Sequence, residues 1–196
     1  MKTTRNYVMR SRAESAELTR QRALHATVAL AGEKPFSTIV LPEVAARAGV
    51  SVQTVLRQFG NRDGLLDAAT AFVSDQLNSQ AVTTPGNVRA ALDALFDHFE
   101  ARGDVIIMLL GQEGWDRRAQ SLTSGEREAH REWVTSVFAP QLAGIATRTR
   151  NELIDMLLVA TDVYTWKVLC RDRGLTRAQA QKRVDRMITA LLTTAT

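Results

Sequence analysis

Apolar side chains recur at intervals of three and four residues along most of the chain, which places them on one face of an α-helix. Leu24, Val28 and Ala31 form one such stripe, and Val184 and Ile188 belong to another near the end. No segment shows the sustained alternation or the hairpin-turn residues of paired strands. The pattern predicts an all-α protein of about nine helices. Seven are expected over residues 13–31, 41–48, 52–59, 62–81, 104–110, 115–143 and 149–173. One more begins near residue 87, and the last follows Thr176.

The two shortest neighbouring segments, 41–48 and 52–59, form a helix-turn-helix pattern. Gly49 ends the first, because glycine tolerates the left-handed conformation of a sharp turn. Val50 is an apolar plug between the helices, and Ser51 is a natural N-cap for the second. That second helix buries Val55 and Phe59 at spacing i, i+4. Its outward face can then read base edges and phosphates. The side chains on that face are Val52, Gln53, Thr54, Arg57 and Gln58.

Charge is unevenly distributed along the chain and supports DNA as a partner. Residues 1–62 hold ten lysines and arginines against four acidic residues, whereas residues 63–196 hold fifteen against seventeen. The positive charge therefore coincides with the helix-turn-helix pattern, where it would attract a polyanion. Residues 1–12 are basic and lack helical periodicity, which predicts a flexible arm that reaches DNA or is simply a solvated tail.

Several classes of protein are disfavoured by what the sequence lacks. No apolar run approaches a membrane span, and no signal peptide is visible, so we expect a cytoplasmic protein. The single Cys170 forms no intrachain disulfide. There is no phosphate-binding loop or nucleophile motif, and no two histidines share a ligand spacing. We therefore expect no catalytic residues, no metal, no cofactor and no enzymatic activity.

The sequence from Val44 to Ser51, VAARAGVS, resembles the I-A-x-x-A-G-V-S motif of the TetR family of transcriptional regulators. Thr54, Phe59 and the Leu65-Leu66 pair match the family pattern that follows. The resemblance is specific over about 19–68, because small, turn and apolar residues must all fall in register. The family usually has other residues at a few positions, namely Ala31, Pro35, Val40, Leu56, Gln58 and Arg62.

The resemblance implies a helix-turn-helix DNA-binding domain at residues 13–62 and a larger ligand-binding and dimerisation domain at 63–196. It implies a homodimer that binds a roughly palindromic double-stranded operator and is released by a small-molecule effector, which describes a repressor. Gln53 is expected on an adenine edge, Val52 on a thymine methyl group, and Arg57 on guanine or phosphate. Phosphate contacts are expected from the remaining candidates, Val40 through its N–H, Ser51, Thr54, Gln58 and Arg62. The alternative for each is an exposed residue without a role.

The segment 149–173 is apolar on more than one face and must be buried on several sides. It is therefore expected to dimerise, together with the last helix, as a four-helix bundle. An effector pocket is expected among the helices of residues 62–173, with Gly103, Gly111 and Gly114 as interruptions that let a helix end move. The candidate pocket residues are Phe72, Phe96, Phe99, Met108, Gln112, Trp115, Trp133 and Tyr164. The alternative for these large side chains is that they fill the core. The rival function is an all-helical ligand-binding or scaffolding protein that no longer binds DNA.

Overall fold

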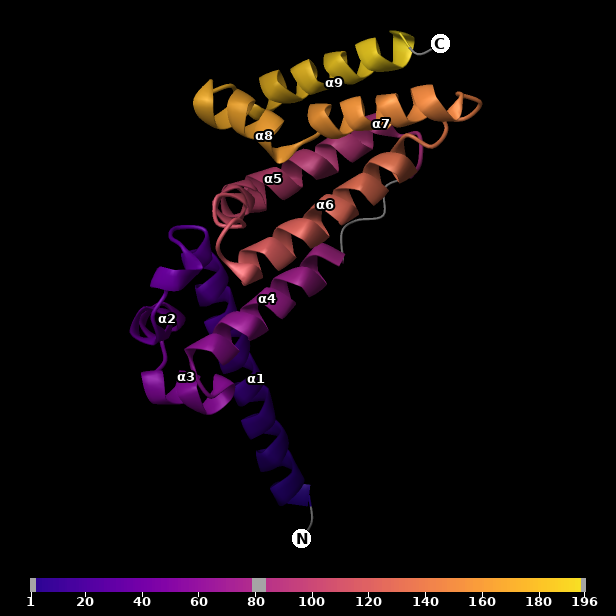
Figure 1. Ribbon diagram of the computed structural model, residues 1–196. Coiled ribbons are helices and arrows are strands. Elements are labelled where there is room, and N and C mark those ends of the chain that lie inside the picture. Colours follow the sequence, from indigo (N-terminus) through magenta and orange to yellow (C-terminus); the bar gives the residue numbers. More distant parts are fainter. Residues whose placement is uncertain (1–2, 79–83, 195–196) are drawn as a thin grey trace. The chain divides into compact units, whose positions relative to one another are not determined.

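The computed structural model describes residues 3–78 and 84–194, and every regular element in those ranges is helical (Figure 1). The prediction of an all-α fold is confirmed. The elements are α1 (Thr3–Ala31), the 3₁₀ turn η1 (Phe36–Thr38), α2 (Leu41–Ala48), α3 (Val52–Phe59), α4 (Arg62–Asn78), α5 (Val88–Leu110), α6 (Arg117–Val137), α7 (Thr147–Ala160), α8 (Val163–Trp166), the π-helical segment η2 (Lys167–Asp172) and α9 (Arg177–Thr194). Within the described ranges, no helix is both long enough and apolar enough to cross a membrane.

The chain forms two compact units. The first comprises residues 1–76 together with 108–122, and the second comprises 77–107 together with 123–196. The first unit therefore includes the α5–α6 turn, which the sequence assigned to the C-terminal domain. We call them the N-terminal unit and the C-terminal unit.

The N-terminal unit contains the helix-turn-helix. Helices α2 and α3 begin and end at the residues that the sequence predicted. Their apolar faces bury Val44, Ala45 and Val55 against α1 and against each other. Phe59 is half-buried, and the guanidinium of Arg20 lies 4.9 Å from its ring centroid. The short helices are thus held by a shared core, since eight residues alone make a marginal helix.

Helix α1 begins at Thr3, ten residues earlier than the sequence predicted. Residues 3–12, expected as a flexible arm, form its first turns, and residues 1–2 lie outside the described part. The segment contains neither glycine nor proline, so nothing in it ends a helix.

Helix α4 ends at Asn78, and residues 79–81 of the helix predicted over 62–81 are outside the described ranges.

The predicted break at Gly103 is wrong, because α5 runs without interruption from Val88 to Leu110. A Cβ atom at Gly103 would lie 2.5 Å from Cζ3 of Trp166. The glycine therefore makes room for a buried indole ring inside the helix packing. Helix α6 is also continuous across residues 121–125, although Gly125 lies within it.

The predicted helix 149–173 is wrong as one element. Helix α7 ends at Ala160, and Asp162 starts α8 by accepting a hydrogen bond from the backbone N–H of Tyr164 at 2.7 Å. A capping side chain inside the apolar run restarts the helix in a new direction. The π-helical segment then continues to Asp172, and Gly174, at φ +63°, follows its end.

Candidate nucleic-acid interface

The turn between α2 and α3 is fixed by backbone hydrogen bonds and by one long-range arginine. Gly49 has φ +65°, and its N–H and that of Val50 donate to the carbonyls of Ala46 and Ala45 at 3.2 and 3.0 Å. The guanidinium of Arg22 on α1 donates to the carbonyls of Ala48 and Gly49. This contact was missed in the sequence, because Arg22 lies 26 residues before Ala48 and no motif marks it.

Helix α3 begins at Ser51, as predicted. The Ser51 hydroxyl accepts from the backbone N–H of Thr54 at 3.1 Å and lies 2.8 Å from the Thr54 hydroxyl. The pair therefore satisfies one free N–H of the first turn. Ser51 is exposed and Thr54 half-buried, so both hydroxyls lie at the edge of the outward face.

The outward face of α3 carries Gln53 and Arg57, both exposed, beside the half-buried Val52. Within the part of the chain that the structure describes, neither Gln53 nor Arg57 forms a side-chain hydrogen bond or an ion pair. The amide of Gln58 donates to the carbonyl of Ala16 on α1 at 3.3 Å. The structure thus leaves Gln53 and Arg57 exposed on α3, whereas Gln58 is partly engaged by α1.

Val40 is exposed just before α2, but its N–H is already engaged. The N–H donates to the Glu43 carboxylate at 3.4 Å, and Glu43 also pairs with Lys34. The hydrogen bond from Lys34 lowers the pKa of Glu43. A phosphate at the start of α2 would have to displace this carboxylate or share the Lys34 ammonium with it.

Arg62 is turned into the N-terminal unit. Its Nε donates to the carbonyl of Ile39 at 2.6 Å, and a terminal nitrogen donates to the carbonyl of Phe36. The third nitrogen lies 3.6 Å from the carboxylate of Asp63. These contacts favour a structural role over the phosphate contact expected from the sequence. The sequence did not reveal these contacts, because the two carbonyls belong to the loop before α2 and only the tertiary structure brings them to Arg62.

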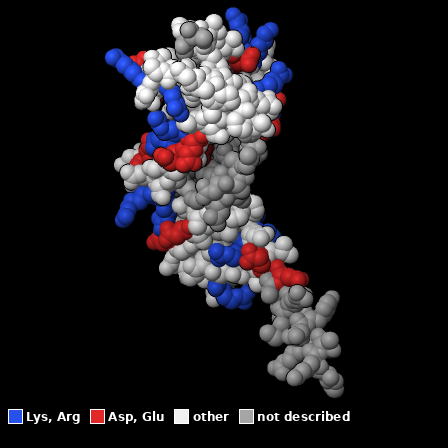
Figure 2. All heavy atoms as spheres, turned by 90° about the vertical axis from the view of Figure 1, so that its right-hand side faces the viewer, with Lys and Arg blue, Asp and Glu red and all other residues white. Residues whose placement is uncertain are grey.

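The charge on this unit is mixed on its visible face. In the lower part of Figure 2, at the height of α1 to α4 in Figure 1, acidic side chains lie among the basic ones. Two of the arginines are paired, Arg47 with Glu33 at 2.7 Å and Arg118 with Asp67 at 2.6 Å. The positive excess of residues 1–62 is therefore not a uniform patch on that face.

Comparison with known proteins agrees with this geometry. Residues 23–69 match the model of the family described as bacterial regulatory proteins, tetR family. Residues 23–69 are therefore a TetR-type DNA-binding domain. The matched residues run from α1 through the helix-turn-helix into α4.

The TetR relatives also match beyond the helix-turn-helix. The HTH-type transcriptional regulator AlkX of Mycobacterium tuberculosis is 29% identical over 150 residues, which cover 76% of this chain and 68% of AlkX. A tetR-family transcriptional regulator from Streptomyces coelicolor superposes with a TM-score of 0.70 at 19% identity, covering 91% of this chain and 82% of its own. A transcriptional regulator from Rhodococcus sp. Rha1 gives 0.68 at 21% identity, covering 90% and 97%. At these identities the two solved structures establish a shared fold.

The TetR assignment settles the class of function. The protein is a DNA-binding transcriptional regulator and not an enzyme. Members of the family bind DNA operators and small-molecule effectors as dimers.

The candidate effector residues divide between the two units. Phe72, Met108, Gln112 and Trp115 belong to the N-terminal unit. Phe72 packs edge-on against His25, with ring centroids 5.0 Å apart. Trp115 is 70% exposed on the α5–α6 turn, so it does not fill a core. Gln112 is buried, and both ends of its amide are hydrogen bonded within the unit.

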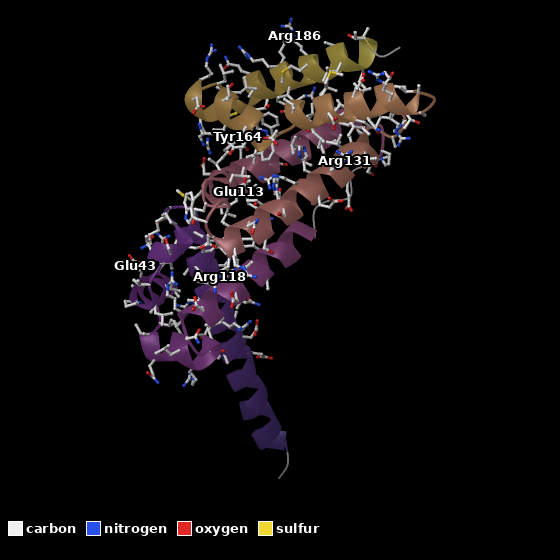
Figure 3. The ribbon with its side chains drawn as sticks, viewed as in Figure 1. Glu43, Glu113, Arg118, Arg131, Tyr164 and Arg186 are labelled. Carbon is white, nitrogen blue, oxygen red and sulfur yellow. The ribbon has the colours of Figure 1, made fainter. Side chains whose placement is uncertain are left out.

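The other four candidates lie in the C-terminal unit. Phe96 and Phe99 are core residues of α5, and the Phe99 ring centroid lies 5.8 Å from that of Trp166. Trp133 is half-buried beside His130, whereas Tyr164 is exposed on α8 (Figure 3). The structure therefore does not gather the eight candidates into one described site.

A partly buried polar cluster lies where α5, α6 and the end of α7 meet in this unit. His98 on α5 lies 3.2 Å from the Glu126 carboxylate on α6, and the other carboxylate oxygen of Glu126 is buried without a hydrogen-bond partner. One turn along α6, Nε2 of His130 lies 2.8 Å from the hydroxyl of Thr161. These residues stand alone in the sequence, so no spacing rule marks them as neighbours.

Helices α7 and α9 lie side by side and present an apolar groove of about 600 Å³ (Figure 1). Large apolar side chains are exposed along this face and the adjacent α8–η2 segment. The exposed set is Met156, Val159, Tyr164, Val168 and Met187. Ile188 of the predicted dimer seam is only 1% exposed and instead belongs to the core.

Proposed function

We propose that the protein is a repressor that binds a palindromic operator as a homodimer and is released by a small molecule. The observation that carries the proposal is the outward face of α3, where Gln53 and Arg57 are exposed on a helix that Ser51 caps and Gly49 orients. A short helix fixed at its N-terminus and presenting polar side chains suits entry into the major groove.

The residue roles follow from exposure. Gln53 reads a base edge, since its amide matches adenine in the major groove, and Val52 meets a thymine methyl group. Arg57 contacts guanine or phosphate. Ser51, Thr54 and Gln58 contact the phosphates that fix the register of the helix on DNA, and the N–H of Val40 joins them once a phosphate displaces the exposed Glu43 carboxylate. Arg62 is left out of this set because its donors are used on Phe36 and Ile39.

The dimer forms through the exposed apolar face of α7, the α8–η2 segment and α9. Val159 is 68% exposed, Val168 50% and Met187 38%, which is unusual for aliphatic and thioether side chains on neighbouring helices. A second copy would bury the same face by twofold symmetry. The apolar lining of the groove between α7 and α9 supports this occupant. Because its operator is chromosomal DNA, the dimer would act in the bacterial cytoplasm.

The effector binds in the C-terminal unit, near the rings of Phe96 and Phe99. Its body is apolar or aromatic, because these rings dominate the local core. The unpartnered carboxylate oxygen of Glu126 favours an effector that donates a hydrogen bond, since a buried acceptor without a partner is costly. To release the operator, the effector must bind the state that does not bind DNA more tightly.

The test begins by selecting bound fragments from the genome that encodes the protein. The shortest selected duplex is then titrated by fluorescence anisotropy at several salt concentrations, beside a scrambled duplex of equal length. We expect preference for the selected duplex and a steep loss of affinity with salt. Equal affinity for both duplexes would favour the alternative, a helical ligand-binding protein that no longer reads DNA. Metabolites that release the selected duplex identify the effector.

A further inference from the structure

The side chain of Gln112 joins the end of α5 to the loop that precedes the helix-turn-helix. Gln112 is 2% exposed, and its Oε1 accepts a hydrogen bond from the Phe36 N–H at 2.8 Å. Its Nε2 donates to the carbonyl of Met108 in the last turn of α5 at 2.9 Å. One carboxamide therefore holds two backbone groups that lie 72 residues apart in the sequence.

The same loop residue is held from a second direction. The carbonyl of Phe36 accepts from Arg62, the first residue of α4, and Arg62 also binds the carbonyl of Ile39. Phe36 and Ile39 are 3% and 1% exposed, and Val40, the N-cap of α2, follows directly. Gln112 and Arg62 together fix the backbone that leads into α2.

Helix α5 belongs to both units along its length. Its residues 88–107 belong to the C-terminal unit, and its last residues to the N-terminal unit. Helix α6 is divided in the same way, and its Arg118 binds Asp67 and Asp63 on α4 at 2.6 and 3.3 Å (Figure 3). Those carboxylates are exposed, so water can replace the bonds of Arg118. The bond between Gln112 and Phe36 is buried, and its loss would leave an unsatisfied N–H.

We propose that Gln112 is the positioning residue through which effector binding in the C-terminal unit changes DNA binding. A displacement of the last turn of α5 moves the carbonyl of Met108 and the amide of Gln112 with it. The Phe36 N–H then loses its acceptor, and the loop before α2 loses one of its two anchors. The proposal rests on the proposed function, because it needs both operator binding and effector control.

Coupling between two sites is reciprocal, so the test needs only operator DNA. Hydrogen exchange is measured on the full-length protein with and without the selected duplex described above. In the wild type, we expect saturating duplex to change exchange of residues 88–107 by about fivefold, the lower end of typical couplings. Gln112→Met, which keeps the length of the side chain and removes both hydrogen bonds, should abolish this change while α3 remains protected by DNA.

The matched control is Thr27→Val, which removes a buried hydrogen bond within α1, from the Thr27 hydroxyl to the Ala23 carbonyl at 2.8 Å. It should lose stability and keep the wild-type response of residues 88–107. If Gln112→Met fails to fold, Gln112→Asn keeps the amide but is one methylene too short to reach Phe36.

An unchanged response in a folded Gln112 variant would overturn the proposal, as would a wild type that binds the duplex without any response in 88–107. Failure of the wild type to bind any selected duplex would instead refute the proposed function itself.

Discussion

Arg62 donates a hydrogen bond from Nε to the carbonyl of Ile39 at 2.6 Å, which joins the start of α4 to the loop before α2. Arg62→Ala should therefore reduce the free energy of unfolding by about 1–3 kcal/mol, because two buried carbonyls lose a donor. Urea unfolding at fixed protein concentration measures the effect. Arg57→Ala is the control, since Arg57 is exposed and should leave stability unchanged. Wild-type stability of Arg62→Ala with a smaller salt dependence of DNA binding would restore the phosphate role.

Gln53→Ala should relax sequence preference at one position in each half-site. We expect a loss of about 1–3 kcal/mol per half-site for the selected duplex and little change for the scrambled one, because the amide reads a base and not a phosphate. Arg57→Ala provides the comparison. If Arg57 contacts a phosphate, this substitution weakens binding to both duplexes and lowers the salt dependence by about one ion per half-site. A uniform loss in Gln53→Ala would mean that another residue reads the base.

Val159→Asp should produce monomers that remain folded. Val159 is 68% exposed on α7, so the aspartate is solvated in the monomer but would be buried in the dimer without a partner. Sedimentation at micromolar concentration and circular dichroism check the two parts of this prediction. Leu18→Asp, at a side chain 62% exposed on α1, controls for the added charge. A dimer of undiminished affinity in Val159→Asp would place the interface elsewhere.

Gly103→Ala should destabilise the C-terminal unit, because the new methyl group would lie 2.5 Å from the ring of Trp166. Overpacking of this kind costs about 1–3 kcal/mol, and urea unfolding followed by tryptophan fluorescence reports it. Gly125→Ala on α6 is the matched control, since nothing lies within 4 Å of its added Cβ. There the gain in helix propensity should stabilise by up to about 1 kcal/mol. Equal effects of the two substitutions would contradict the packing role of Gly103.

Stability should fall as the pH is lowered through the ordinary titration range of histidine. Burial lowers the pKa of His130, against the opposing fields of Asp162 and Glu126, while His98 lowers it further. The unfolded chain therefore takes up this proton first, so the contribution of neutral His130 is complete above its unfolded pKa and is lost as the pH falls below it. His130→Gln should flatten the unfolding free energy across about pH 5–7. An unaltered pH profile in that variant would assign the dependence to another group.

The sequence determined the helix-turn-helix nearly to the residue. Gly49, Ser51 and Asn61 act through groups within a few positions of themselves, and the Asn61 side chain accepts from the Gly64 N–H at 2.8 Å as expected of an N-cap. Such local chemistry is readable along the chain, because glycine conformation and capping need no distant partner. The all-α class followed equally directly from the helical spacing of apolar residues.

Only the tertiary structure decided what the isolated polar and glycine residues do. Gly103 seemed to be a helix break, but the ring of Trp166 fills the space beside it. Gln112 seemed to belong to an effector pocket, yet its partner is the backbone N–H of Phe36, which no spacing rule connects to it. The family resemblance implied a phosphate contact for Arg62, but its nearest acceptors are carbonyls of the loop before α2. Hydrogen bonds and packing between distant segments depend on where the fold brings them, and a one-dimensional pattern does not contain that distance.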